Sequence, residues 1–409
     1  MISLTLENLR IKLIMLLPIL TCFDSYCIFY VGSFPVTLSF VDIFLVLFLS
    51  FFVRKTIDQF TTVLWLIILI LISWIFFEVN ITSALLYIFY FLAFGLSKHS
   101  MDRIQINKSL KSFLFFINIF NIVALLQMLS NFTSLPRIDF IVETHMVEGF
   151  NRTNLIYLGN FVFYRSNAFY LEPSTLSQYC VLGIISSCYL YRDGIFSKKK
   201  LAFSFLLNIM ALITSVSGTG ILMLIISFFV YILKSKKNKN KLYIIIVVLL
   251  FFSFLILVSW STIRNYIFQR VIEIFNPTLS GGMRFLFPYI MCFKSFAKWK
   301  IGIGPGNEVQ AIIEFVPEML KLQSTIASGY AKIFIELGVI GLVILVCCIK
   351  KCRHYEYYYI YLYIILLNFM GGNLLQTCFW AFMIFMNYTS KIYLLEGEKI
   401  NERYNISRR

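Results

Sequence analysis

Long apolar runs recur from one end of this chain to the other, and they limit what it can fold into. Most of these runs have roughly 17 to 25 residues, enough for a helix to cross about 30 Å of hydrocarbon. The 409 residues are 59% hydrophobic and only 14% charged, with a mean hydropathy of +0.82. We therefore predict an all-α, polytopic integral membrane protein that forms a single domain over residues 1–409.

Run length and flanking charge together predict about twelve transmembrane helices. Their expected ranges are Leu13–Val31, Pro35–Val53, Phe60–Phe77, Ile81–Leu96, Leu110–Leu129, Pro173–Tyr191, Leu201–Thr214, Thr219–Leu233, Leu242–Trp260, Tyr330–Ile349, Tyr355–Met370 and Leu374–Ile392. The first run follows Arg10 and Lys12 and lacks a small-residue cleavage site. We expect a retained span there and not a signal peptide.

The formal net charge of +16 comes largely from short basic connections between apolar runs. These connections contain Arg54 and Lys55; Lys98, Arg103, Lys108 and Lys111; Arg192 and Lys198 to Lys200; residues 234–241; and residues 350–354. The alternate connections, around Gly32, Val79, Ser217 and Gly371, have no lysine or arginine. By the positive-inside rule both termini are cytoplasmic, and the charge does not indicate a nucleic-acid partner.

Two outward connections are far longer than tight turns, at about residues 130–172 and 261–329. Loops of this length inside a compact domain are usually functional. In the second loop, Phe285, Tyr289, Phe293 and Phe296 recur at helical spacing, with Lys294 and Lys298 on the opposite side. We expect short interfacial helices in these loops, and the chemistry of the protein beside them.

The first long loop ends in "RSNAFYLEPSTLSQY", residues 165–179. Pro173 fits the first turn of a helix, which places Glu172 at its cap, close to Arg165. A helix N-terminus also suits a phosphate group. Glu172 is therefore a candidate catalytic residue, and simple helix capping is the alternative explanation.

Six arginines lie in the outward loops, where translocated segments should contain few. They are Arg137, Arg152, Arg165, Arg264, Arg270 and Arg284. A guanidinium group stays charged and binds phosphate oxygens in pairs, so the six residues suit a lipid diphosphate. Contact with lipid headgroups is the alternative for any one of them.

"GGMR" at 281–284 and "GIGPGN" at 302–307 form a glycine-rich feature in the second loop. Gly302, Gly304 and Gly306 would let backbone amides approach a phosphate or a sugar. The pattern matches no nucleotide-binding fingerprint, and a tight turn between two interfacial helices is the alternative.

Few other residues are candidates for chemistry. Lys332 and Glu336 are four residues apart on one helix face and should neutralise each other. His145, between Glu143 and Glu148, is the one outward imidazole and a candidate base or substrate ligand, although such a group is more often just solvated. Nine cysteines without paired spacing predict neither a disulfide framework nor a metal site.

The chain resembles the O-antigen and capsule polymerase family (Wzy-type), part of a wider group that includes O-antigen ligases. The matching features, in order, are Arg165, Phe169 and Glu172 to Ser174; "SVSGTG" at 215–220; Arg284 followed by the "GIGPG" turn; and "ELGVIGL" at 336–342. The likeness extends roughly from residue 110 to 390. In the ligase branch a histidine usually precedes the last motif by about ten residues, whereas residues 324–330 here contain none.

The resemblance implies a bacterial inner-membrane glycosyltransferase of lipopolysaccharide biosynthesis. Such an enzyme moves a growing glycan from undecaprenyl diphosphate to another lipid-linked repeat unit at the periplasmic face. Arg165, Arg284, Arg264 and Arg270 would bind the diphosphates, while Glu172 accepts the hydroxyl proton or orients an arginine. No metal or cofactor is expected. A chain-length regulator and a flippase are candidate partners, and a ligase, a flippase or an envelope scaffold are the competing functions.

Overall fold

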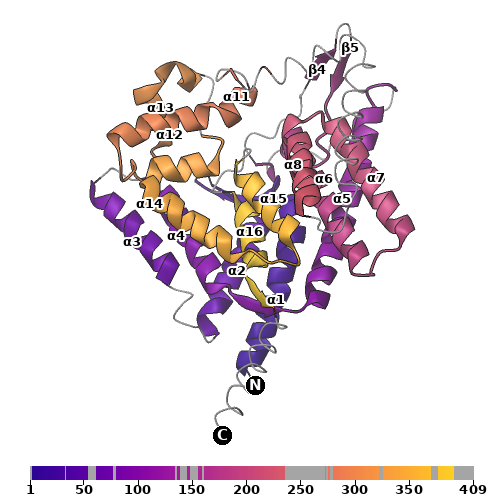
Figure 1. Cartoon of the computed structure of the whole chain (residues 1–409), viewed down its shortest axis with the longest axis horizontal. Coiled ribbons are helices and arrows are strands. Elements are labelled where there is room, and N and C mark those ends of the chain that lie inside the picture. The colour runs from indigo at the N-terminus through magenta and orange to yellow at the C-terminus, as the bar shows by residue number, and fades with distance from the viewer. Residues whose placement is uncertain are drawn as a thin grey trace.

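The computed structural model describes residues 2–32, 34–53, 61–76, 80–133, 136–138, 145–147, 155–158, 161–234, 272, 275–276, 280–321, 326–369 and 376–390. Within these residues the chain is mostly helical, which confirms the predicted class (Figure 1). The predicted span Leu242–Trp260 and the candidate residues Arg152, Arg264 and Arg270 lie outside the described residues.

Most of the helices coincide with the predicted spans. Their ranges are α1 Ile2–Leu20, α2 Leu38–Phe52, α3 Thr61–Phe76, α4 Ile81–Leu96, α5 Arg103–Leu129, α6 Pro173–Arg192, α7 Lys198–Ser215, α8 Gly218–Lys234, α11 Ser280–Phe285, α12 Phe287–Lys298, α13 Glu308–Phe315, α14 Gly329–Lys351, α15 Tyr358–Phe369 and α16 Thr377–Met386. Short 3-10 turns follow at η1 Thr21–Phe23 and η4 Pro317–Lys321. Helix α5 begins at Arg103 and not at Leu110, because Asp102 and Gln105 form a capping box ahead of the apolar run.

Three small two-stranded sheets depart from the all-α prediction. They pair β1 Cys27–Val31 with β2 Phe34–Thr37, β4 Leu155–Leu158 with β5 Phe161–Tyr164, and β3 His99–Met101 with β6 Tyr388–Ser390, the last pair parallel. The predicted helix Leu13–Val31 is therefore wrong after Leu20. Polar Asp24 and Ser25 interrupt the apolar run, and the β-branched and aromatic residues that follow favour a hairpin.

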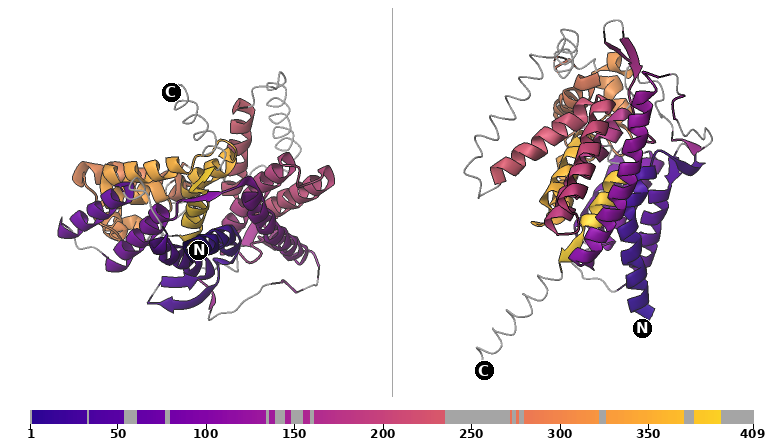
Figure 2. Two further views of the ribbon diagram at one scale, coloured as in Figure 1. Left: turned by 90° about the horizontal axis from the view of Figure 1, so that it is seen from below. Right: turned by 90° about the vertical axis from the view of Figure 1, so that its right-hand side faces the viewer.

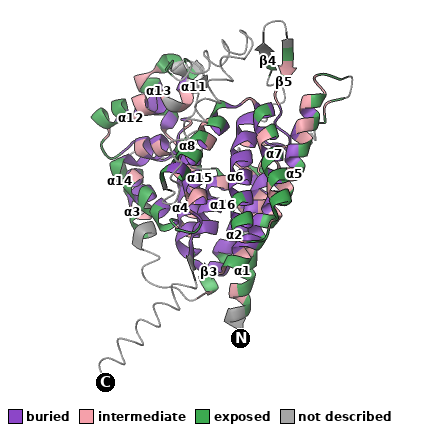
Figure 3. Cartoon of the chain, turned by 45° about the vertical axis from the view of Figure 1, so that its right-hand side comes forward, coloured by how far each residue is buried: buried purple, intermediate pink, exposed green. Residues whose placement is uncertain are grey.

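The core and the exterior of the bundle are both apolar. Helices α6 and α16 lie at the centre and are buried over most of their length (Figure 3). Large apolar side chains nevertheless face outward on the peripheral helices, among them Phe48, Trp65, Ile75, Phe203 and Ile213. A surface of this kind is stable in hydrocarbon and unfavourable in water, so the helices fit insertion into a membrane.

Two of the described helices, Arg103–Leu129 and Gly329–Lys351, are long and apolar enough to cross a membrane by length and composition. Five further apolar helices in the described residues are shorter: Leu38–Phe52, Ile81–Leu96, Gly218–Leu233, Tyr358–Phe369 and Thr377–Met386. The number of twelve spans thus stays a prediction from the sequence.

Small residues and amides pack α5, α6 and α7 against one another. Asn121 of α5 donates from Nδ2 to Oδ1 of Asn208 in α7 over 2.9 Å. Gly183 of α6 lies so close to Asn208 that a Cβ atom there would fall 2.1 Å from Oδ1. Buried amides paired across small residues are typical of helices that associate within a bilayer.

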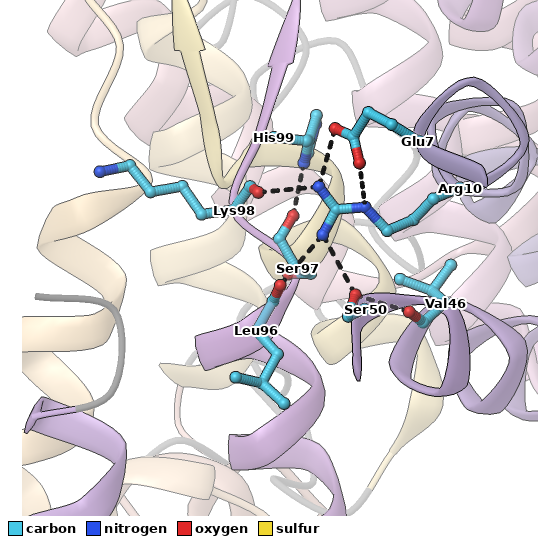
Figure 4. Close-up of polar contacts among 8 residues, drawn as sticks. All are labelled: Glu7, Arg10, Val46, Ser50, Leu96, Ser97, Lys98 and His99. Atoms are coloured by element: carbon cyan, nitrogen blue, oxygen red, sulfur yellow. Dashed lines mark hydrogen bonds and ion pairs between the residues drawn. The ribbon is translucent and has the colours of Figure 1, made fainter. Parts of the chain in front are cut away.

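A buried arginine ties three elements together at the end of the molecule that carries the N-terminus (Figure 4). Arg10 of α1 pairs with Glu7 and donates to Ser50 Oγ at 3.1 Å, Leu96 O at 3.0 Å and Lys98 O at 3.1 Å. The two carbonyls belong to the end of α4 and its connection to α5, so a cation there complements the helix dipole. These hydrogen bonds join α1, α2 and the C-terminal end of α4.

The other basic connections that the structure describes meet at this same end. Arg103, at the start of α5, pairs with Asp193, which caps α6, and Arg192 donates to the carbonyl oxygen of Glu356 over 2.6 Å. We call this region, with Arg10, the basic end. The hairpin β4–β5 and helices α11 to α13 project at the opposite end of the bundle, the outer end (Figures 1 and 2). Within the described residues, these basic turns and the helices of the long loops thus lie at opposite ends.

Candidate functional site

At the outer end, Glu172 stands at the N-cap of α6, followed by Pro173 in the first turn, as predicted. Its side chain makes no capping hydrogen bond to that helix. Arg284 of α11 instead donates from Nη2 to both carboxylate oxygens, at 3.2 and 3.3 Å, and the Ser174 hydroxyl donates to Oε1. The side chains of Glu172 and Arg284 are 36% and 27% exposed. The two long loops therefore meet in a half-exposed ion pair.

Both candidate arginines also contact the turn between α7 and α8. Arg284 donates from Nη1 to Thr219 Oγ1 over 3.4 Å, and Arg165 donates from Nε to Ser215 O over 2.8 Å. Val216 adopts a left-handed conformation with φ of 45°, which reverses the chain between the two helices. The "SVSGTG" segment thus contacts both arginines, of which Arg284 is the one that pairs with Glu172.

Arg137 contacts the segment that carries Arg165. Its Nη2 donates to Arg165 O at 3.3 Å and to Asn167 Oδ1 at 3.1 Å, and its guanidinium lies 5.2 Å from the centre of the Tyr164 ring. These contacts bind Arg137 to the backbone that carries Arg165. The described geometry therefore favours a positioning role for Arg137; the predicted contact with phosphate stays a prediction.

Gln127, near the end of α5, is a residue that the sequence did not single out. Its Oε1 accepts from the amides of Asn167 and Ala168, at 3.2 and 2.8 Å, and Nε2 donates to Ala168 O at 3.1 Å. Ala168 has a positive φ of 49°, a conformation that costs an alanine free energy and needs such support. A buried glutamine in a predicted span was the available signal.

The glycine-rich turn docks on α14. Gly338 interrupts that helix with φ of 66° and ψ of −165°. Regular helix geometry would pair the Ile335 and Glu336 carbonyls with residues four positions later; here they accept from Ile303 and Gly304, at 3.0 and 2.8 Å. A Cβ atom on Gly302 would lie 2.4 Å from Glu336 O, so only glycine fits there.

The amides of the predicted glycines are engaged within the chain. Gly302 donates to Trp299 O at 3.2 Å, Gly304 to Glu336 O, and Gly306 to the Glu336 carboxylate at 3.0 Å. All three residues have positive φ. This geometry favours the tight-turn alternative, while contact of Gly302, Gly304 and Gly306 with substrate stays a prediction.

Lys332 and Glu336 form the expected pair across one turn of α14, at 3.7 Å. A closer partner was missed: Lys332 Nζ lies 2.6 Å from Oε1 of Glu308, the first residue of α13. Tyr87 of α4 donates to the other Glu336 oxygen over 2.6 Å. All of these side chains are buried, so this second cluster joins α4, α13 and α14 inside the protein.

His145 lies elsewhere on the outer end. It is exposed, and the next residue, Met146, bridges to Tyr26 and accepts from the Tyr30 hydroxyl over 2.6 Å. The described contacts thus place His145 beside β1 and not with Glu172. Among the described residues there is also no group of three or more His, Cys, Asp or Glu side chains that could hold a metal ion.

Arg165, Glu172 and Arg284 are partly exposed, and Thr219 beside them is buried. This cluster has the chemical character of an anion site with a built-in counter-ion. A carboxylate holds Arg284 by weak, long contacts, and an incoming phosphate oxygen would offer stronger ones. The SVSGTG turn keeps both guanidinium groups oriented, so little reorganisation is needed when the anion binds.

Comparison with known proteins concerns the part of this cluster that contains Thr219 and Arg284. No curated protein matches the chain. A family model does match, and the matched segment includes most of α7, all of α8, Thr219, Arg284, the glycine turn and most of α14, but not Arg165 or Glu172. Residues 203–346 of this chain match the model of a family described as O-antigen ligase, which confirms the resemblance to the wider group of O-antigen ligases and polymerases.

Proposed function

We propose that this protein is a surface-polysaccharide polymerase of the bacterial inner membrane. It transfers a growing glycan from undecaprenyl diphosphate to the terminal sugar of another lipid-linked repeat unit, at the periplasmic face. The single observation that carries the proposal is that Arg165 and Arg284 contact one turn at the outer end, where Arg284 also pairs with Glu172. In this orientation both termini and the basic end face the cytoplasm, and about twelve helices cross the membrane.

The reaction needs stabilisation of a leaving group. The acceptor hydroxyl attacks the anomeric carbon of the donor glycan, the bond from that carbon to the diphosphate oxygen breaks, and the hydroxyl proton goes to a base. Undecaprenyl diphosphate leaves with the bonding electrons, so negative charge grows on its oxygens. Arg165 and Arg284 bind those oxygens, together with Arg264, Arg270 and Arg152 from the rest of the loops.

Glu172 has two candidate roles, orienting Arg284 and accepting the hydroxyl proton, and its contacts favour orientation before substrate binds. The carboxylate is already bonded to Arg284 and Ser174, which suits the orientation of Arg284 before the substrate arrives. Once the diphosphate takes over Arg284, the same carboxylate is released beside the reacting centre and is free to accept the hydroxyl proton. Replacement of Glu172 by Gln separates these roles, since the amide keeps an acceptor oxygen but is no base.

A ligase that moves finished polysaccharide to lipid A core is the second candidate, because the matching family model is described as O-antigen ligase. The absence of histidine from residues 324–330 favours the polymerase. The two reactions share donor chemistry and differ in the acceptor.

A deletion strain tests the proposal directly. Its surface polysaccharide, run on a gel, should show lipid A core capped with one repeat unit and no ladder. Loss of all capped core would indicate a ligase, and precursor trapped inside the cell would indicate a flippase. A wild-type ladder would exclude all three functions.

A further inference from the structure

An apolar cavity of about 370 Å³ lies between α12 and α14. Its wall on α12 includes Tyr289, Cys292 and Phe296, and its wall on α14 includes Ala331, Phe334 and Leu342. None of the lining residues carries a charge. Ala331 has the shortest side chain of the lining residues.

The surroundings of this cavity are suited to hydrocarbon and not to water. Phe293, at its rim, is 82% exposed, and Phe296 is 45% exposed. Val339 and Ile340 of α14 are exposed beside them. In hydrocarbon no hydrophobic term favours one apolar occupant over another, so a chain that binds there is held by van der Waals packing in the cavity and by the contacts of its head group.

The cavity lies near the proposed diphosphate site along the chain. Tyr289 follows Arg284 by five residues, across the junction of α11 and α12. From Tyr330 to Leu337, before the break at Gly338, the α14 wall runs for about 10 Å at 1.5 Å per residue. A cationic site followed by an apolar groove is complementary to an amphiphile with an anionic head and a hydrocarbon tail.

We propose that this groove holds the isoprenoid chain of the carrier lipid next to its diphosphate. The inference rests on the proposed function, and it adds the apolar part of the substrate, which the arginines do not bind. Binding of the chain along α12 and α14 sets the height of the diphosphate relative to Arg284 and Arg165, and thus aligns the anomeric carbon with the acceptor.

Site-specific photocrosslinking of the full chain in nanodiscs of phosphatidylethanolamine and phosphatidylglycerol tests the occupant. Benzoylphenylalanine replaces Phe296 in the groove or, as the matched control, Ile313, which is 51% exposed on α13 and outside the groove. With undecaprenyl diphosphate added, position 296 should give an adduct of that mass at least about tenfold more often than position 313. Adducts of phospholipid alone, unchanged by the added carrier, would overturn the proposal.

Two further arms separate this inference from the proposed binding of the diphosphate by Arg165 and Arg284, which we call the arginine clamp. If undecaprenol, which has no phosphate, competes at position 296 and Arg284→Ala does not weaken the diphosphate adduct, the isoprenoid chain binds in the groove but the arginine clamp does not hold the diphosphate. If Arg284→Ala removes the adduct, both proposals are supported. Equal adducts at positions 296 and 313 would reject the groove whatever the clamp does.

Filling the groove gives an independent test. Ala331 and Ala311 are both buried in the same small core, but only Ala331 lines the groove. Ala331→Leu should raise the concentration of undecaprenyl diphosphate needed for half-maximal crosslinking by about tenfold or more, while Ala311→Leu should not. Overpacking destabilises both variants similarly, so equal melting temperatures with unequal lipid binding support the proposal, and equal binding contradicts it.

Discussion

The two ends of this molecule use charged side chains in opposite ways. At the basic end Arg10 is buried and donates to a carboxylate, a hydroxyl and two carbonyls. At the outer end Arg284 is partly exposed, and its hydrogen bonds to Glu172 and Thr219 are all 3.2 Å or longer. A saturated buried cation stabilises a fold, whereas a loosely held exposed cation is available to a ligand.

The largest effect that tests this contrast is expected at the basic end. Arg10→Met should destabilise the protein by about 3 kcal/mol, because buried carbonyl and hydroxyl groups lose their partner. Melting temperature in detergent and the fraction that elutes as a monomer measure it. Polymerisation per folded molecule should stay near wild type. A loss of activity without loss of stability would contradict the assignment of Arg10 to the fold.

The outer end should show the reverse. Arg284→Ala should reduce polymerisation about 100-fold or more at normal expression, since one cation at the leaving group is removed, yet change the melting temperature little, because an exposed pair is worth about 0–1 kcal/mol. The length distribution of surface polysaccharide reports activity.

Lys298 offers a matched control for that variant. It pairs with Glu314 on the same outer loop and is more exposed than Arg284. Lys298→Ala should leave the ladder intact, and Arg284→Lys should fail if bidentate binding matters. Full activity in Arg284→Ala would contradict the proposal that Arg284 binds the diphosphate.

A pH response should mark the basic end. Burial lowers the pKa of His99 from 6.5 to about 3. Below pH 6.5 the unfolded chain takes up a proton that the folded chain does not, so stability falls as pH drops toward 3. Between pH 6.5 and 5 the loss is about 2 kcal/mol at 1.36 kcal/mol per pH unit. Melting temperatures at pH 7.5 and 5 should differ less in His99→Gln than in wild type.

The smallest expected effect concerns Thr219, which positions Arg284 at the outer end. Thr219→Val should lower activity about tenfold through the loss of one hydrogen bond to a charged group. Thr219→Ser should restore it, because only the hydroxyl matters. Rescue by serine but not by valine distinguishes orientation from packing, and equal activity in the two variants would show that Thr219 is only structural.

Much of the fold could be predicted because helix length and apolar content are local properties of the chain. Helices α4, α6 and α8 begin and end close to the predicted limits. The hairpin β1–β2 was missed because its residues are as apolar as those of a helix, and only the pairing with another strand distinguishes the two.

The candidate site was predicted in part for a similar reason. Glu172 could be placed by the proline that follows it, and its arginine partner belongs to the predicted set. The pairing of Lys332 with Glu308 could not be predicted, since residues 24 positions apart meet only through the docking of α13 on α14. Tertiary contacts of this kind have no periodic signature in a single sequence.

The close backbone contact between the glycine turn and α14 limits which residues can be substituted or exchanged there. A Cβ atom on Gly302 or on Gly338 would strike main-chain atoms of the opposing segment, and neither backbone has room to retreat. Exchanges of the outer loop between related chains should therefore transplant residues 302–306 and 335–338 as one unit. Substitutions in the remainder of the loop should then be tolerated more easily, because they leave this backbone contact unchanged.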